Sequence, residues 1–345
     1  MDLMVAVEHH QGVTRRAALL FVALGLAWGI PYLLIKIAVG ELAPSVLVLA
    51  RTGLAALLLL PIALARREVA PVLRHWRPVL AYTVIEIVFP WLFLSRAEQH
   101  LPSSTTGLLI TAVPIVGVLV AKAGGRAERL GRRGWLGLAL ATAGVAALVG
   151  FDLGGSDLPA VAEMAVVVVG YAIGPAILAR RLSDVPGLGV VAVSLTASAL
   201  IYVPVVLLGP GLPSRLPSGG VIASVALLAL VCTAVAFLLL FALVAEIGPV
   251  RSTAIVYLNP VVAIAAGAVF LHEQVTAWTL IGFALALTGS VLITRRTSTP
   301  ALEPAPASAA APPSTPALEP APASVPEPAP ASAPASAPAS APVSA

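Results

Sequence analysis

Charged side chains are scarce in this chain of 345 residues: Asp, Glu, Lys and Arg make up only 10% of it, against 59% hydrophobic residues. A typical soluble protein carries about 25% charged residues. The chain therefore lacks the polar groups needed to cover a globule of this size in water, and its mean hydropathy is +0.99. The composition excludes a soluble domain and predicts a polytopic membrane protein, because a bilayer core of roughly 30 Å requires apolar runs of about 20 residues.

Cysteine and catalytic motifs are also missing. The single cysteine, Cys232, excludes an intramolecular disulfide framework and any cysteine-cluster metal site. The sequence has no Walker A motif and no HExxH zinc pattern, and all five histidines fall outside the predicted spans. We therefore expect no enzymatic activity, no metal, no cofactor and no direct use of ATP.

Apolar segments separated by short polar breaks occupy most of the chain. Their approximate limits are 17–39, 43–64, 79–97, 103–122, 134–151, 159–181, 187–209, 219–244, 250–271 and 275–294. This pattern predicts an all-α integral membrane protein with ten transmembrane helices. The connections are too short to hold a soluble domain, so the function is expected to lie inside the helical bundle.

Lysine and arginine are distributed unevenly between the two ends of the predicted spans. If the spans alternate in direction, 16 of the 20 basic residues fall on one side and 2 (Arg96 and Arg215) on the other, while Lys36 and Arg51 lie within spans. The positive-inside rule then predicts a protein of the cytoplasmic membrane with both termini in the cytoplasm. The net charge of +4 is thereby explained as a topology signal, and no nucleic-acid partner is expected.

Four parts of the chain can be distinguished. Residues 1–16 form a cytoplasmic N-terminus, 17–151 a first unit of five helices, and 159–296 a second unit of five helices. Residues 297–345 are rich in Pro, Ala and Ser, and such a segment is expected to be a disordered cytoplasmic tail. We favour a tail with no essential role in transport; docking of a partner is the alternative.

An ordered series of glycines and prolines recurs at a separation near 145 residues. The matched features are Gly25-x-x-x-Gly29 with Gly170-x-x-x-Gly174, Pro31 with Pro175, Pro44 with Pro186, Pro114 with Pro260, and Gly137 and Gly144 with Gly282 and Gly289. Because five spans per copy is an odd number, the second copy must enter the membrane from the opposite face. The repeat is therefore predicted to be inverted, an architecture that places a substrate site near the midplane between the halves.

The sequence resembles the drug/metabolite transporter (DMT) superfamily, EamA type, over about 17–296. The resemblance rests on Trp28-Gly29, Pro44 to Arg51, Pro114, Gly248-Pro249, Tyr257-x-Asn259-Pro260 and Leu271-His272-Glu273, in that order. It implies two inverted five-helix halves around a central cavity. It also implies a transporter of small metabolites or drugs, with export favoured on family grounds alone.

Glu86 is the most prominent ionisable residue inside a span. It lies near the middle of 79–97, shares a helical face with Tyr82, and precedes Pro90, which removes the partner of its backbone carbonyl. Charged groups at such depth are costly and mark functional positions. Glu86 is predicted to couple transport to protons or to bind an amine; a purely structural carboxyl is the alternative.

Arg51 lies about eight residues into the second span, or roughly 12 Å from its end. It is a candidate to bind an anionic group of the substrate. A structural ion pair with Glu86 is the competing interpretation, because the two residues lie at similar depths.

Further candidates line the expected cavity or permit its movement. Trp28 and Tyr32 repeat at helical spacing with Lys36 and would offer an aromatic stripe. The predicted substrate-binding set also contains Thr106, Tyr171, Tyr257 and Asn259, and the predicted hinges are Pro31, Pro90, Pro114, Pro175 and Pro260.

These observations predict a secondary active transporter that works by alternating access, with export as the favoured direction. Coupling to protons and exchange with a counter-substrate both remain open. The alternatives are a lipid-linked or nucleotide-sugar carrier, which only Arg51 supports, and an intramembrane enzyme acting on lipid. The expected partners are a small-molecule substrate and the lipid bilayer, and the sequence allows a monomer or a homodimer.

Overall fold

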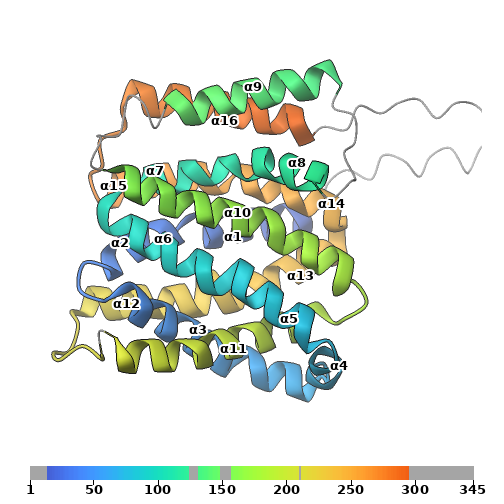
Figure 1. Ribbon diagram of the computed structural model, residues 1–345, viewed down its shortest axis with the longest axis vertical. Coiled ribbons are helices and arrows are strands. Elements are labelled where there is room, and N and C mark those ends of the chain that lie inside the picture. Colours follow the sequence, from blue (N-terminus) through green and yellow to red (C-terminus); the bar gives the residue numbers. More distant parts are fainter. Residues whose placement is uncertain (1–13, 124–130, 148–156, 210, 295–345) are drawn as a thin grey trace, which may run out of the picture. The chain divides into compact units, whose positions relative to one another are not determined.

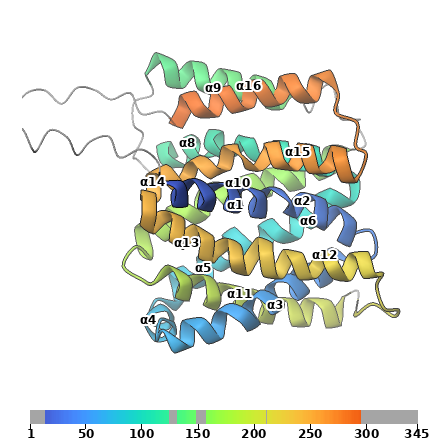
Figure 2. The same ribbon diagram turned by 180° about the vertical axis from the view of Figure 1, so that it is seen from behind.

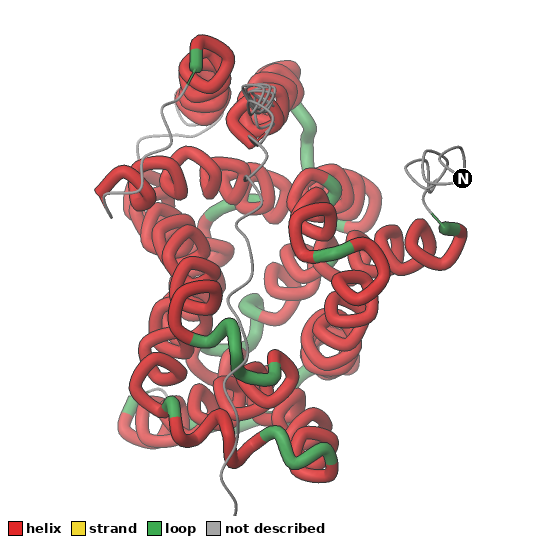
Figure 3. Tube along the Cα trace, turned by 90° about the vertical axis from the view of Figure 1, so that its right-hand side faces the viewer, coloured by secondary structure: helices red, strands yellow, loops and turns green. Residues whose placement is uncertain are grey.

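The computed structural model describes residues 14–123, 131–147, 157–209 and 211–294. These residues form helices and connecting loops, with no strand among them (Figure 3). The expected cytoplasmic N-terminus, apart from its last three residues, and the expected tail after residue 294 lie outside the described residues.

The described helices form ten spans, which confirms the all-α prediction. Seven are long and apolar enough to cross a bilayer as judged by length and composition, and two shorter apolar helices cover Ala254–Phe270 and Ala277–Leu292. The spans are, in order: α1 (Arg15–Gly29) with α2 (Pro31–Ala38); α3 (Pro44–Ala65); α5 (Trp76–Tyr82), η1 (Thr83–Val88) and α6 (Phe89–His100); α7 (Ser103–Leu109), η2 (Ile110–Ala112) and α8 (Val113–Ala123); α9 (Arg132–Ala147); α10 (Leu158–Arg181); α11 (Gly187–Leu208); α12 (Gly219–Ala229), η5 (Leu230–Val235) and α13 (Ala236–Ile247); α14 (Pro249–Ser252), η6 (Thr253–Tyr257) and α15 (Asn259–Phe270); and α16 (Ala277–Thr294). A short helix, α4 (Val69–Arg74), connects the second and third spans.

The packing of the spans repeats between the two halves. Span 2 (α3) packs on span 7 (α11), and span 5 (α9) packs on span 10 (α16), with the two pairs at opposite sides of the bundle (Figures 1 and 2). Span 1 contacts spans 8 and 9 through α1, α2, α12, α13 and α15, and span 6 (α10) contacts spans 3 and 4 through α6 and α8. Each of these contacts has a counterpart between the corresponding spans of the other half, which lie five spans further along or back in the chain. The contacts of span 1 with spans 8 and 9, for example, correspond to those of span 6 with spans 3 and 4. Such a pattern is what a pseudo-two-fold axis between inverted halves produces.

Interruptions of the α-helices repeat as well. Spans 3 and 8 each contain a π-helical turn, η1 and η5, while spans 4 and 9 each contain a 3₁₀ turn, η2 and η6. Pro90, Pro114 and Pro260 occupy the second position of the α-helix that follows such a turn. A proline at this position cannot donate to the preceding turn and clashes with its carbonyl, so it favours a local break.

The other two predicted hinges behave differently from each other. Pro31 begins α2 directly after the break at Ile30. Pro175 lies inside the uninterrupted helix α10, so its role as a hinge stays a prediction. Pro31 and Pro175 therefore occupy matching positions in the sequence repeat, but only Pro31 lies next to a break in the helix.

The repeated glycines allow close helix packing. A Cβ atom at Gly25 or Gly29 would overlap Leu258 or Val262 in the ninth span. At Gly170 and Gly174 it would overlap the turn η1 and the residues around it. These glycines thus bring span 1 against span 9 and span 6 against span 3, which is the usual role of small residues at membrane helix interfaces.

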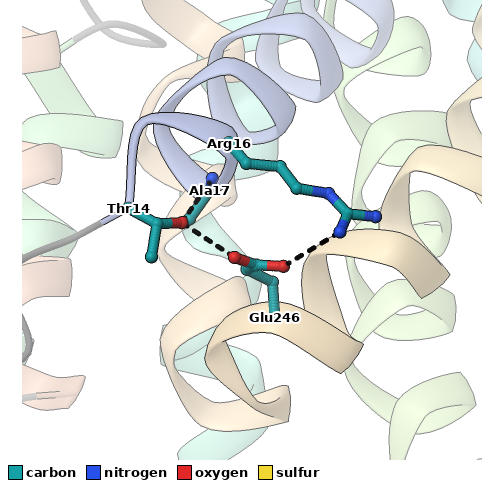
Figure 4. Close-up of polar contacts among 4 residues, drawn as sticks. All are labelled: Thr14, Arg16, Ala17 and Glu246. Atoms are coloured by element: carbon teal, nitrogen blue, oxygen red, sulfur yellow. Dashed lines mark hydrogen bonds and ion pairs between the residues drawn. The ribbon is translucent and has the colours of Figure 1, made fainter.

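Polar contacts fasten the start of the first span to the eighth. The Thr14 hydroxyl accepts a hydrogen bond from Ala17 N at 3.0 Å, capping α1, and donates to Glu246 Oε1 at 2.8 Å (Figure 4). Arg16 lies 3.7 Å from the other oxygen of Glu246. The chain then turns at Gly248, whose φ of +81° favours glycine.

Candidate functional site

Arg51 lies in the interior of the bundle, on α3. Its side chain is 7% exposed. The Nε group donates to Thr233 Oγ1 at 3.0 Å, and the guanidinium carbon lies 3.8 Å from the centre of the Trp91 ring. No carboxylate lies within ion-pair distance of Arg51 among the described residues. Arg51 is therefore a buried cation held by one hydroxyl and one aromatic face, and its terminal nitrogens have no hydrogen-bond partner among the described residues.

The π-helical turn η5 explains how Thr233 reaches Arg51. The Thr233 hydroxyl donates to the Leu228 carbonyl, five residues earlier, at 2.7 Å. It is therefore oriented to accept from Arg51 Nε with its lone pairs. Because π-helical turns in α-helices often occur at functional sites, this contact between spans 2 and 8 marks a position of interest.

Aromatic side chains surround Arg51. The Trp91 indole lies beside the Tyr171 hydroxyl, which is within electrostatic reach of both Arg51 and Glu86. Tyr32 also lies near Arg51 and Tyr171. Of the predicted substrate residues, the structure thus brings Tyr32, Arg51 and Tyr171 together, and it adds Trp91.

Glu86 lies in the turn η1, at the position that corresponds to Thr233 in η5. Its side chain is half-buried, its Oε2 atom has no hydrogen-bond partner among the described residues, and the carboxylate packs on Gly174 of α10. Tyr82 and Tyr171 lie within electrostatic reach of its carboxylate. No ion pair joins Glu86 to Arg51 among the described residues, so the pairing considered from the sequence is not observed.

The remaining candidates have other contacts. Trp28 packs edge-to-face on Phe237, with ring centres 5.9 Å apart. The Thr106 hydroxyl donates to the carbonyl of Pro102, the N-cap residue of α7, and the Tyr257 hydroxyl donates to the Ser290 carbonyl of α16. Asn259 is the first residue of α15, and its buried Oδ1 atom has no hydrogen-bond partner in the described part of the chain. Their roles in substrate binding stay predictions.

A network of helix-end contacts closes one end of the bundle, which we call the Glu273 end. Lys36 Nζ donates to the carbonyls of Glu98 and Leu101 at 2.7 and 2.8 Å. Glu273 accepts from the backbone N–H groups of Ser103 and Ser104 at 2.7 and 2.9 Å. These contacts join spans 1, 3, 4 and 9, so they would have to break for that end to open.

Acidic residues at this end are ionised helix caps. Burial acts to raise the pKa of Glu273, but hydrogen bonds from Ser104 and Ser103 outweigh it and leave the pKa below its usual value. Ser218 likewise lowers the pKa of Glu41, which accepts from Ser218 N at 2.8 Å before α12. Carboxylates at helix N-termini are favoured by the helix dipole and the free N–H groups.

The opposite end has a comparable contact, and we call it the Glu68 end. Glu68 Oε2 accepts from Gly189 N at 3.0 Å, at the start of α11. Both ends of the bundle are therefore bridged by a carboxylate that caps a helix from another span.

A cavity of about 300 Å³ opens beside the Glu273 end, between the second, third and sixth spans. Its lining includes Pro44, Arg96 and Glu163, and the last two form an ion pair at 2.7 Å. Arg51 and Glu86 do not line this cavity. It is thus distinct from the site around Arg51.

Sequence reasoning missed three residues of this interior region. Trp91 resembled an ordinary apolar residue of a span, and Thr233 carried no motif. Glu98 falls one residue beyond the predicted third span, 79–97, but it is fully buried in α6. The two glutamates at 86 and 98 lie twelve residues apart on one span, and extending that span to His100 would have placed both inside the membrane.

Comparisons with known proteins agree with the fold. The model of the EamA-like transporter family matches residues 15–150 and 159–295. The chain is 26% identical over 250 residues to the uncharacterized inner membrane transporter YedA of Escherichia coli strains K12, O6:H1 and O157:H7, covering 71% of this chain and 79% of each relative. A crystal structure that is 22% identical superposes with a TM-score of 0.58, covering 80% of this chain and 95% of the other. With two copies of the family's domain spanning the ten helices, the chain belongs to the EamA-like transporter family.

Proposed function

We propose that the protein is a secondary active transporter of the inner membrane that exports a small metabolite or drug bearing an anionic group. The observation that carries this proposal is Arg51, a buried cation with no carboxylate partner among the described residues. Leaving such a charge uncompensated is costly, and a substrate carboxylate or phosphate would compensate it. The guanidinium fork suits a bidentate contact with either group.

The aromatic residues beside Arg51 set the shape of the bound molecule. Trp91 fixes one face of the guanidinium, while Tyr32 and Tyr171 contribute hydroxyl groups at its side. Such surroundings favour a substrate with an anionic head and an apolar or aromatic body. Tyr82 and Glu86 extend the site towards the Glu68 end, where Glu86 would exchange protons during the cycle.

The repeated packing of the two halves supports transport by alternating access. The Glu273 end and the Glu68 end would open in turn, with bending at the breaks next to Pro31, Pro90, Pro114 and Pro260. The distribution of arginine between the loops supports a cytoplasmic position for the Glu68 end and for both termini under the positive-inside rule.

The test is flux through purified protein in liposomes. Carboxylates, phosphorylated metabolites including nucleotide sugars, polyamines and dyes would be supplied with and without a pH gradient. We expect Arg51→Met to lower the flux of the anionic substrate at least tenfold, and Arg51→Lys to lower it less. Arg215→Lys, at an exposed loop position, is the control and should retain normal flux.

Two results would oppose the proposal. Normal flux in Arg51→Met would show that Arg51 is structural. Transport of nucleotide sugars alone would favour the carrier considered from the sequence over a general metabolite exporter. For the coupling role, Glu86→Gln should abolish stimulation by a pH gradient; if it transports normally at every pH, its carboxyl is structural.

A further inference from the structure

The Glu98 carboxyl lies buried inside the bundle without a hydrogen bond to any described residue. It is 0% exposed, and neither carboxylate oxygen has a hydrogen-bond partner among the described residues. A buried carboxylate without hydrogen bonds is strongly disfavoured, and a group in this position takes up a proton to become neutral. The proposed function assigns Glu98 no role.

Two charged groups near Glu98, Lys36 and Glu273, form hydrogen bonds with backbone groups and not with the Glu98 carboxylate. Lys36, on α2, donates to the backbone carbonyls of Glu98 and Leu101, and no ion pair joins it to the Glu98 carboxylate among the described residues. Glu273 caps α7. The buried carboxyl therefore lies beneath a set of helix-end contacts and takes part in none of them.

Three further ionisable groups face Glu98 from the interior. They are Arg51 on α3, Tyr32 on α2 and Tyr171 on α10. Among the described residues, Lys36 and Glu273 are the other titratable groups within electrostatic reach of this carboxyl. Glu98 thus lies between the proposed substrate contact, Arg51, and the closed Glu273 end.

We propose that Glu98 is a proton-binding site of the transport cycle, separate from Glu86, that is loaded from the Glu273 end. This inference rests on the proposed transport function. A proton from water forms an O–H bond with a Glu98 carboxylate oxygen, and the neutral acid can then remain buried while that end closes. Release of the proton to water regenerates the carboxylate.

The ionised form would destabilise the closed end. An anionic Glu98 would attract the Lys36 ammonium away from the two carbonyls that it caps, and it would compete with an anionic substrate for Arg51. Proton uptake at the Glu273 end therefore permits closure after the substrate has left. If that end is external, as the arginine distribution predicts, the sequence of steps is exchange of an outgoing substrate for an incoming proton.

The first test needs no substrate. Infrared difference spectra of the purified full chain in lipid vesicles would be recorded while the pH is changed. Glu98→Gln should remove one carbonyl band of a protonated carboxyl, while Glu163→Gln, which alters an ion-paired carboxylate at the same end, should leave every such band in place. An unchanged band in Glu98→Gln would overturn the proposal.

The second test uses flux. Glu98→Gln, which resembles the protonated form, should lose accumulation driven by a pH gradient, whereas Glu98→Asp should retain at least part of it. Gradient-driven transport at the normal level in Glu98→Gln would also overturn the proposal. If wild-type protein transports nothing while the infrared band is still lost in Glu98→Gln, the proposed function fails but protonation of Glu98 is supported.

Discussion

The contact between Glu273 and the start of α7 offers the most direct test of how the Glu273 end is held closed. Glu273→Gln keeps one carbonyl oxygen but removes the charge, and Glu273→Ala removes both acceptors of the Ser103 and Ser104 N–H groups. Loss of a helix N-cap costs about 0.5–2 kcal/mol. Glu273 is half-buried, and solvent therefore screens part of its charge. We expect the substitution to glutamine to destabilise the closed end by about 1 kcal/mol and the substitution to alanine to destabilise it by about 2 kcal/mol. These energies correspond to opening equilibria shifted about fivefold and about thirtyfold.

A single-cysteine label can measure this shift. Cys232 is the only cysteine of the chain and is buried, so Cys232→Ala provides a background in which Thr105→Cys is the reporter. Thr105 lies in α7 and is buried. Reaction with a membrane-impermeant maleimide then follows the open population, and its rate should rise about fivefold in Glu273→Gln and about thirtyfold in Glu273→Ala.

The control is Glu163→Gln, which removes an ion pair at the same end without touching α7. Its labelling rate should stay close to that of the background protein. Equal rates in the background and in Glu273→Ala would refute the argument, because they would show that the cap does not limit opening.

Three other predictions concern packing and pH. Gly174→Ala would push a methyl group into the Glu86 carboxylate and should destabilise the protein by about 1–3 kcal/mol, measured as thermal unfolding in detergent, whereas Gly53→Ala, with open space at its Cβ, should not. Tyr202→Phe removes the hydroxyl that donates to a carbonyl of η1 at 2.7 Å and should cost about 1–3 kcal/mol; an unchanged unfolding temperature would contradict this. Because the pKa of Glu273 is lowered on folding, its contribution to stability is present above its unfolded pKa and is lost as the pH falls through the folded value. The labelling rate of the reporter, corrected for the smaller thiolate fraction of a cysteine at low pH, should therefore rise only in acid. This acid-dependent rise should be absent in Glu273→Gln, and a rise of the same size in that variant would point to another group.

Much of the architecture was predictable because it depends on local composition. Ten apolar segments, their limits and the inverted duplication followed from span length, breaks and the spacing of glycines and prolines. The described helices agree with these limits to within a few residues. The breaks next to Pro114 and Pro260 could also be predicted from the sequence, because proline disturbs a helix within one turn of its own position.

The residues that form the interior site were harder to predict from the sequence, because the site depends on contacts between segments that are distant in the chain. Arg51 and Glu86 stood out as charges inside spans, but their depths alone made an ion pair between them plausible. In the folded chain Arg51 instead meets Thr233, 182 residues away, and the ring of Trp91. The third span ends at His100 and not at residue 97, so Glu98 lies inside it and not beyond it.

The sequence by itself determined that this chain is a membrane protein of ten helices in two related halves, because hydrophobic length and small-residue spacing are properties of each segment alone. Only the tertiary structure decided which charges are paired, which are left without a partner, and which carboxylates cap a helix from another span. The reason is physical: the cost of a buried charge depends on the atoms that surround it, and those atoms come from spans that are far apart in the chain.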